Sequence, residues 1–304
     1  MPGGRADHDV LTRDPARLAR PLDLLYQEYN REDSASDPVN LVRPFTDRSD
    51  REVAAFCAGA LAFGRVASVL QSIGTLLRIM GPRPAAFVRG FDPRQPHPEL
   101  RAMVHRWTRG EDLAALLWVL RQMLERSGSV EAFFAEGLKP DDPDVGRALD
   151  SFSTRAMALD IRRAYGRLPR RPGVCYFFPR PSGGSACKRL NLFLRWMVRQ
   201  DAIDPGGWSA VPASKLVVPL DTHVIRLGQC LRLTRYTSPG WRMAADITAS
   251  LRRLDAEDPV RFDFSLCHLG MRNACGFGRR RGDAQCPLKG LCRPRGRLRL
   301  PARS

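Results

Sequence analysis

Two short stretches of the chain carry residue types that a nucleophilic reaction needs. PSGGSACKRLNLFLRWMVRQ (181–200) places one lysine, Lys188, in the first turn of an apolar helix. KLVVPLDTHVIRLGQCL (215–231) places Asp221 where an extended run turns into a helix. A lysine amine can bond covalently to an electrophilic carbon, and a carboxylate can stabilise positive charge that develops beside it.

Both residues also have a plainer interpretation. Lys188, Arg195 and Arg199 lie seven and four residues apart, on a stripe opposite the apolar face of their helix. Helical periodicity alone predicts that such a stripe is solvated. Asp221 is equally well placed as a simple N-cap of the helix that follows it. Local chemistry therefore leaves the nucleophile and the solvated cation both open.

The turn before Lys188 has features of an anion site. Gly183 and Gly184 permit backbone conformations that other residues avoid. Ser185 is expected to cap the helix that follows. A turn of this kind at a helix N-terminus offers unpaired N–H groups that can hold a phosphate. A Gly-Gly pair is common in proteins, so the turn by itself does not identify a function.

The elements that must position these residues are mainly helices. Apolar residues recur at helical spacing over 67–80 and 113–124. Asp50 is expected to cap a helix through REVAAFCAGALAF. Ser238-Pro239 and Asp258-Pro259 each predict the start of a further helix.

Alternating, strand-like patterns are rare in the sequence. VCYFF (174–178) and KLVVPL (215–220) are the two exceptions, and both are short and close to proline. We therefore expect a mainly α fold.

Composition restricts the class of protein. The 304 residues, 43% of them apolar, can bury a core, and 49 Lys and Arg against 32 acids give a net charge of +17. Such an excess predicts a polyanionic partner, namely DNA, RNA or an anionic membrane. An arginine-rich composition that follows from GC-rich coding is the alternative explanation.

Membrane insertion and secretion are not indicated. The longest uncharged apolar run, residues 53–64, is shorter than the roughly 18 residues of a membrane span. The N-terminus lacks the apolar segment of a secretion signal. We expect a monomeric cytoplasmic protein without a membrane partner, whose eight cysteines are reduced.

Taken together, GSACKRLNLFLRWMVR and VPLDTH resemble sequences of the helix-hairpin-helix DNA glycosylase superfamily, which includes endonuclease III and the 8-oxoguanine glycosylases. More closely, they resemble a bacterial and archaeal family of unknown function inside that superfamily. The resemblance extends from about residue 20 to residue 295. It implies two interlocked helical lobes at 19–293 with a catalytic cleft between them, a flexible arm at 1–18 and a basic tail at 294–304.

The resemblance also implies roles for individual residues. Lys188 would attack the sugar C1′ and form a Schiff base, and Asp221 would stabilise the oxocarbenium-like transition state. Damaged duplex DNA would be the partner and oxidised purines the lesions, with strand cleavage by AP-lyase chemistry. The residues expected to contact DNA are Gly183, Gly184, Ser185, Arg189, His223 and Arg226.

The sequence departs from the superfamily at two points. Lys188 and Asp221 are 33 residues apart (221 − 188), a long connection that is similar to that of the archaeal 8-oxoguanine branch. PSGGSAC replaces the usual LPGVG-type hairpin. The altered hairpin favours an alternative, a nucleic-acid-binding module of the same fold that has lost catalysis.

Four cysteines near the C-terminus have the density of a metal site. Cys267, Cys275, Cys286 and Cys292 lie within 26 residues, and thiolates suit either a [4Fe-4S] cluster or zinc. Only the last gap, CPLKGLC, matches the iron–sulfur spacing of endonuclease III relatives. Cys267 also lies in an apolar helical stretch, where a buried free thiol is an ordinary finding.

Aromatic residues could stack on a base that leaves the duplex. The candidates from the sequence are Trp196, Trp208, Trp241, Phe177 and Phe178, each of which is equally compatible with a place in the core.

Overall fold

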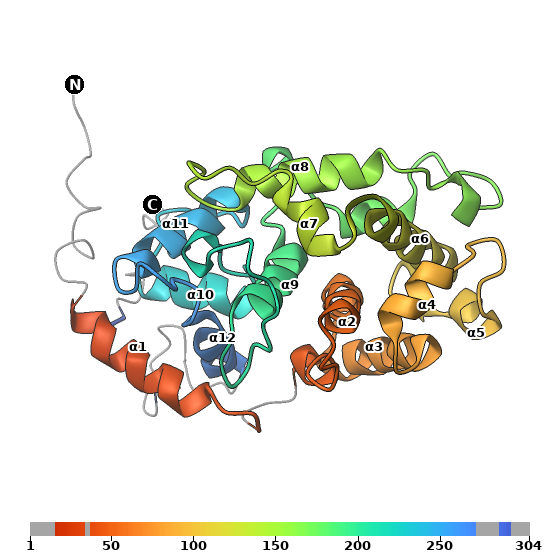
Figure 1. Cartoon of the computed structure of the whole chain (residues 1–304). Coiled ribbons are helices and arrows are strands. Elements are labelled where there is room, and N and C mark those ends of the chain that lie inside the picture. Colours follow the sequence, from red (N-terminus) through yellow and green to blue (C-terminus); the bar gives the residue numbers. More distant parts are fainter. Residues whose placement is uncertain (1–15, 34–36, 272–285, 293–304) are drawn as a thin grey trace, which may run out of the picture.

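The prediction of a mainly α fold is confirmed. A computed structural model of the chain describes residues 16–33, 37–271 and 286–292 (Figure 1). These residues form twelve α-helices, five short 3-10 helices and one two-stranded hairpin. The α-helices are α1 Ala16–Tyr29, α2 Arg48–Leu61, α3 Val66–Met80, α4 Pro84–Gly90, α5 Pro98–Ala102, α6 Gly110–Ser127, α7 Val130–Ala135, α8 Gly146–Met157, α9 Lys188–Val198, α10 Thr222–Cys230, α11 Trp241–Arg252 and α12 Asp263–Met271.

Helix α9 lies between two groups of helices. On one side α2 packs against α9 and α4, and α4 packs against α6. On the other side α10 and α1 both pack against α12. Figure 1 shows α1, α10, α11 and α12 gathered at one end of the molecule and α2 to α6 at the other. The helix that begins with Lys188 therefore joins the two ends.

The contact between α2 and α9 is close because of a glycine. A Cβ at Gly59 would lie 3.3 Å from the Arg189 carbonyl oxygen and 3.3 Å from Phe193 Cβ. Beside this point the rings of Phe56 and Phe193 meet edge to face, with 5.0 Å between their centroids. A larger residue at position 59 would push α9, and with it Lys188, away from α2.

A network of buried charges holds the other side of α9. Arg195 Nε lies 3.2 Å from Asp204 Oδ1, and Arg195 Nη1 lies 2.6 Å from Asp263 Oδ2 at the start of α12. Arg199 pairs with Asp204 and with Asp258. Both arginines and Asp204 and Asp263 are buried. The prediction of a solvated stripe through Arg195 and Arg199 was therefore wrong, because buried carboxylates draw both guanidinium groups inward.

Four predicted helix starts differ from the structure. Helix α11 begins at Trp241 after Gly240 rather than after Ser238, and α12 begins at Asp263 rather than after Asp258. Asp47, not Asp50, caps α2 by accepting from Asp50 N at 3.0 Å, while Asp50 Oδ1 accepts from Ala85 N at 2.8 Å. Helix α9 follows Cys187, whose φ is +48°, and Ser185 does not cap it. Ser185 Oγ instead accepts from Cys187 N at 3.1 Å within the turn.

The strand-like runs form no sheet. Residues Gly173–Phe177 form a 3-10 helix, and the run at 215–220 begins in the 3-10 helix Ala213–Lys215 and continues without regular structure. The remaining 3-10 helices are Pro38–Leu41, Arg162–Ala164 and Pro181–Gly183. The hairpin pairs β1 (Val104–His105) with β2 (Thr108–Arg109), a feature that alternation over two residues cannot reveal.

The ends of the chain bear on the predicted boundaries. Helix α1 begins at Ala16, three residues before the predicted start of the domain at residue 19. Residues 1–15 of the expected arm and the expected tail at 294–304 lie outside the described residues. Within the described part of the chain, none of the helices has both the length and the apolar character to cross a membrane.

The buried network yields a stability prediction. Removal of one partner leaves carboxylates buried without their counter-charge, which costs about 3–5 kcal/mol. We expect Arg199→Ala to lower the free energy of unfolding by that amount in urea denaturation. Arg162→Ala is the control, because Arg162 pairs with Asp160 in solvent and is 80% exposed. Equal midpoints for the two variants would show that the network does not stabilise the fold.

Candidate active site

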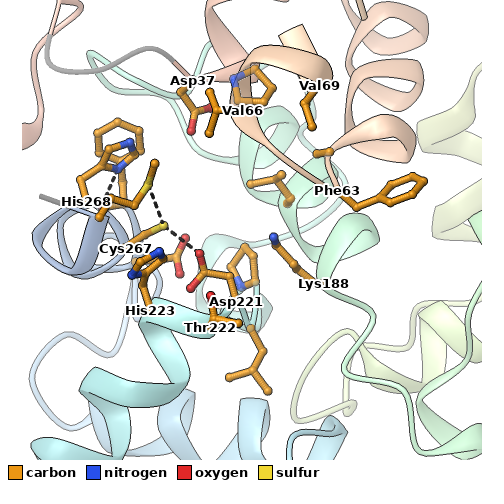
Figure 2. A pocket seen from close by; sticks show the side chains of 18 of the residues that line it. Asp37, Phe63, Val66, Val69, Lys188, Asp221, Thr222, His223, Cys267 and His268 are labelled. Atoms are coloured by element: carbon orange, nitrogen blue, oxygen red, sulfur yellow. Dashed lines mark hydrogen bonds between the residues drawn. The ribbon is translucent and has the colours of Figure 1, made fainter. Parts of the chain in front are cut away.

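A cavity of about 450 Å³ lies where the two groups of helices meet beside α9. Its wall comes from the turn after α2, the start of α3, α9, the first turn of α10, and α12. Lys188 and Asp221, which are far apart in sequence, both line it (Figure 2). Apolar residues that include Val66, Val69, Leu192 and Ile225 cover much of the remaining wall.

Lys188 is the first residue of α9 and is half-buried. In Figure 2 its amine points into the cavity, toward the side of Asp221. Neither a salt bridge nor a hydrogen bond joins this amine to any residue that the structure describes. The space between Lys188 and Asp221 is therefore open to a ligand that could contact both.

Asp221 has both carboxylate oxygens engaged. Oδ1 accepts from Val224 N at 2.7 Å, so Asp221 is the N-cap of α10. Oδ2 accepts from the thiol of Cys267 at 2.9 Å. The interpretation of Asp221 as an N-cap is thus confirmed, and the same cap fixes the carboxylate in the cavity wall.

Cys267 lies on α12 in the wall of the cavity. Burial, together with the negative charges of Asp221 and Asp263, raises the pKa of the Cys267 thiol well above its ordinary value. The thiol is therefore protonated at neutral pH and acts as a hydrogen-bond donor to Asp221. A metal ligand would have to be a thiolate, so this hydrogen bond and metal binding by Cys267 exclude each other.

Two of the other three predicted metal ligands, Cys286 and Cys292, lie within the described residues. Cys286 is buried and Cys292 is half-buried, whereas Cys275 lies outside the described residues. Among the residues that the structure describes, no group of three His, Cys, Asp or Glu side chains could hold a metal ion. Because Cys275 is not included, the four-cysteine site stays a prediction.

Four buried polar atoms of residues that line the cavity have no hydrogen-bond partner in the described part of the chain. They are Arg195 Nη2, Asp263 Oδ1, His268 Nε2 and His223 Nδ1. His268 is oriented by its other ring nitrogen, Nδ1, which lies 2.9 Å from the Phe264 carbonyl oxygen. These atoms are closed off from solvent, so each missing hydrogen bond is an energetic cost concentrated in the residues around the cavity.

Asp263 adds a group that can change its charge. Burial raises the pKa of Asp263 to about 7, and the ion pair with Arg195 opposes that rise. Asp263, Cys267 and His268 were not recognised as neighbours of Asp221 from the sequence. The sequence feature that could have linked two of them is the i, i+4 spacing of Asp263 and Cys267, which places both on one face of α12.

The residues expected to hold a DNA phosphate are only partly available for it. Gly183 and Gly184 are exposed, and Gly184 has a φ of +82°, which favours glycine. At the same turn, however, Asp150 Oδ1 accepts from Ser182 N at 3.0 Å and from Ser182 Oγ at 2.7 Å. A carboxylate thus lies at the turn that the sequence assigned to a phosphate.

The three remaining expected DNA contacts lie in three different environments. Arg189 is buried, donates to the carbonyl oxygens of Ala60 and Tyr176, and so links α9 to its neighbours rather than facing solvent. Arg226 is exposed on α10. His223 lines the cavity and packs on α12, where a Cβ at Gly270 would lie 2.7 Å from His223 Cβ.

Comparison with known proteins places the chain in a family. The family model described as "Protein of unknown function (DUF2400)" matches residues 37–272, which is 236 of the 304 residues (272 − 37 + 1). The chain belongs to the DUF2400 family. No curated protein and no solved structure matches it. The match spans every residue that lines the cavity, the first being Asp37 and the last Met271.

The hydrogen bond between Cys267 and Asp221 in this DUF2400 protein predicts the reactivity of the thiol. We expect iodoacetamide to alkylate Cys267 far more slowly than the exposed Cys175 near neutral pH, as measured by peptide mass spectrometry. Asp221→Asn removes a negative charge and should accelerate the alkylation of Cys267, by at most about tenfold for each unit by which the thiol pKa falls, because the larger thiolate fraction is partly offset by lower nucleophilicity. Equal rates in the native protein and the variant would contradict the contact.

Proposed function

We propose that this DUF2400 protein is a DNA glycosylase with AP-lyase activity, in which Lys188 is the nucleophile and Asp221 its electrostatic partner. The observation that carries the proposal is their place in one cavity: an amine without a partner among the described residues, across open space from a doubly held carboxylate. The charge of +17 supports a polyanionic substrate.

The reaction follows from these two groups. Lys188 Nζ, once deprotonated, bonds to C1′ of the sugar as the bond from C1′ to the base breaks, and the base leaves with the electron pair and takes up a proton. Asp221 stabilises the positive charge that develops on the sugar. The sugar ring then opens at the C1′–O4′ bond: O4′ keeps the electron pair and takes up a proton released from the attached nitrogen, and a protonated imine remains on Lys188.

Strand cleavage uses the same imine. Loss of the C2′ proton and departure of the 3′ phosphate break the DNA backbone, and water hydrolyses the imine to release Lys188. The base must leave the duplex stack to reach Lys188. The polar residues Arg195, Asp263 and His268 line the cavity that would receive the base, and the edges of bases carry both donors and acceptors. An oxidised purine is the first lesion to test.

Covalent trapping tests the nucleophile. With borohydride and an oligonucleotide that carries an abasic site or 8-oxoguanine, we expect a stable protein–DNA adduct from the native protein. Lys188→Ala should give none, and Lys188→Arg, which keeps the charge but is not nucleophilic, should also give none. Fluorescence anisotropy should show DNA affinity within about threefold of native in Lys188→Arg, so that the loss is chemical.

Two results would reject this function. An adduct that persists in Lys188→Ala would reject Lys188 as the nucleophile. Salt-dependent DNA binding without any adduct across a panel of lesions would favour the alternative, a binding module without catalysis.

Asp221 should contribute more to base release than to strand cleavage. We expect Asp221→Asn to slow base release in single turnover by roughly a hundredfold, the scale for loss of one preorganised charge contact. Asn can still cap α10. Cleavage at a preformed abasic site should slow less, since no base departs there. Equal losses in the two assays would contradict the role of Asp221 in base release.

A further inference from the structure

Three aromatic side chains form a surface beside the cavity. Trp107 is 53% exposed and Tyr176 is 40% exposed, although both are large hydrophobic residues. Their ring centroids are 5.2 Å apart, and Phe63 lies 5.0 Å from Trp107 and 5.4 Å from Tyr176. We call Phe63, Trp107 and Tyr176 the aromatic triad. Its members come from three segments that are far apart in sequence.

Trp107 is held outward by a rigid hairpin. In the β1–β2 hairpin the flanking residues His105 and Thr108 are both buried. The two ring nitrogens of His105 lie 2.9 Å from Ser72 Oγ and 2.9 Å from the Phe63 carbonyl oxygen. The turn residues Arg106 and Trp107 are thereby left at the tip. Exposed aromatic rings that form a contiguous cluster, unlike a single exposed residue, indicate a contact with something outside the chain.

The triad carries positive charge as well as rings. The Arg106 guanidinium lies 5.1 Å from the Trp107 ring, and that of the buried Arg189 lies 3.8 Å from the Tyr176 ring. Arg106 has a φ of +57°, which is rare for a residue with a side chain. Aromatic faces combined with arginine are the chemistry that binds unpaired bases on a charged backbone.

The triad is continuous with the cavity through Phe63. Phe63 is one of the residues that line the cavity, and its ring contacts both other members of the triad. In Figure 2 the Phe63 ring points out of the cavity, away from Asp221. A chain of nucleotides that places one sugar between Lys188 and Asp221 would therefore bring a neighbouring base to the triad.

We propose that the aromatic triad is a stacking surface for an unpaired nucleobase of the same DNA molecule that enters the cavity. This inference rests on the proposed function in taking DNA as the ligand. It adds a second binding site, which is separate from the reacting residues. Trp107 supplies the exposed ring face, and Arg106 supplies the charge beside it.

Tryptophan fluorescence gives a direct test. Of the five tryptophans, Trp118, Trp196 and Trp208 are buried and Trp241 is half-buried, so Trp107 is the one most exposed to a quencher. The titration uses Lys188→Arg protein, which blocks the chemistry, and duplex oligonucleotides with a single abasic site at fixed salt. We expect the DNA to quench the emission, and Trp107→Ala to remove that quenching.

Affinity provides the second readout. Trp107→Ala in the same background should weaken DNA binding by roughly tenfold to a hundredfold, the range for loss of one stacking aromatic. Trp107→Tyr should stay within about threefold of the parent, because a ring remains. Leu24→Ala is the matched control, since Leu24 is 57% exposed on α1 and should not affect binding. Thermal melting of each variant checks that the hairpin is intact.

The outcomes separate the two proposals. Unchanged affinity and quenching in Trp107→Ala would overturn the stacking surface whatever the result of trapping. Intact quenching by DNA together with a failure to trap any adduct would reject the catalytic role of Lys188 and leave the stacking surface supported. An equal loss of affinity in Leu24→Ala would overturn the assignment to Trp107.

Discussion

The buried ion pairs of Arg195 determine how the candidate site is built. Arg195 is bonded to Asp204 and Asp263 with almost no access to solvent, and ion pairs without water are tolerated only when every charge is matched. Lys188 lies seven residues before Arg195, which is about two turns of helix, so the two side chains share a face of α9. The carboxylates hold Arg195 in the interior. The face of α9 that bears both residues is therefore turned toward the cavity, and Lys188 lines its wall.

The same constraint positions the other wall of the site. Asp263 is the first residue of α12, so its ion pair with Arg195 fixes α12 relative to α9. One turn later on α12, Cys267 donates to Asp221 at the start of α10. Three helices thus meet through two polar contacts, and each contact restrains a side chain that faces the cavity. The contacts that hold these three helices together therefore also set the positions of the side chains that face the cavity.

The same buried charges leave polar atoms without partners. Arg195 Nη2 and Asp263 Oδ1 are buried and have no hydrogen-bond partner among the described residues, although each side chain makes the ion pair through another atom. Most buried polar groups in proteins are hydrogen-bonded, and each exception costs free energy. Both residues line the cavity, so part of the energetic cost of this fold is concentrated at the candidate site.

The sequence alone determined the helical class, the helix that begins near Lys188 and the cap at Asp221, because periodicity and capping are local signals. The resemblance predicted that Lys188 and Asp221 act together, and tertiary structure brings both into the wall of one cavity. Tertiary structure decided which aromatics reach solvent: Trp196, Trp208, Phe177 and Phe178 lie in the core, whereas Trp107 and Tyr176 lie outside. Tertiary structure also buries Arg195, which helical spacing had placed on a solvated stripe. It brings the Cys267 thiol into a hydrogen bond with Asp221. Burial depends on partners distant in the chain, and helical spacing shows which residues share a face but not what that face meets.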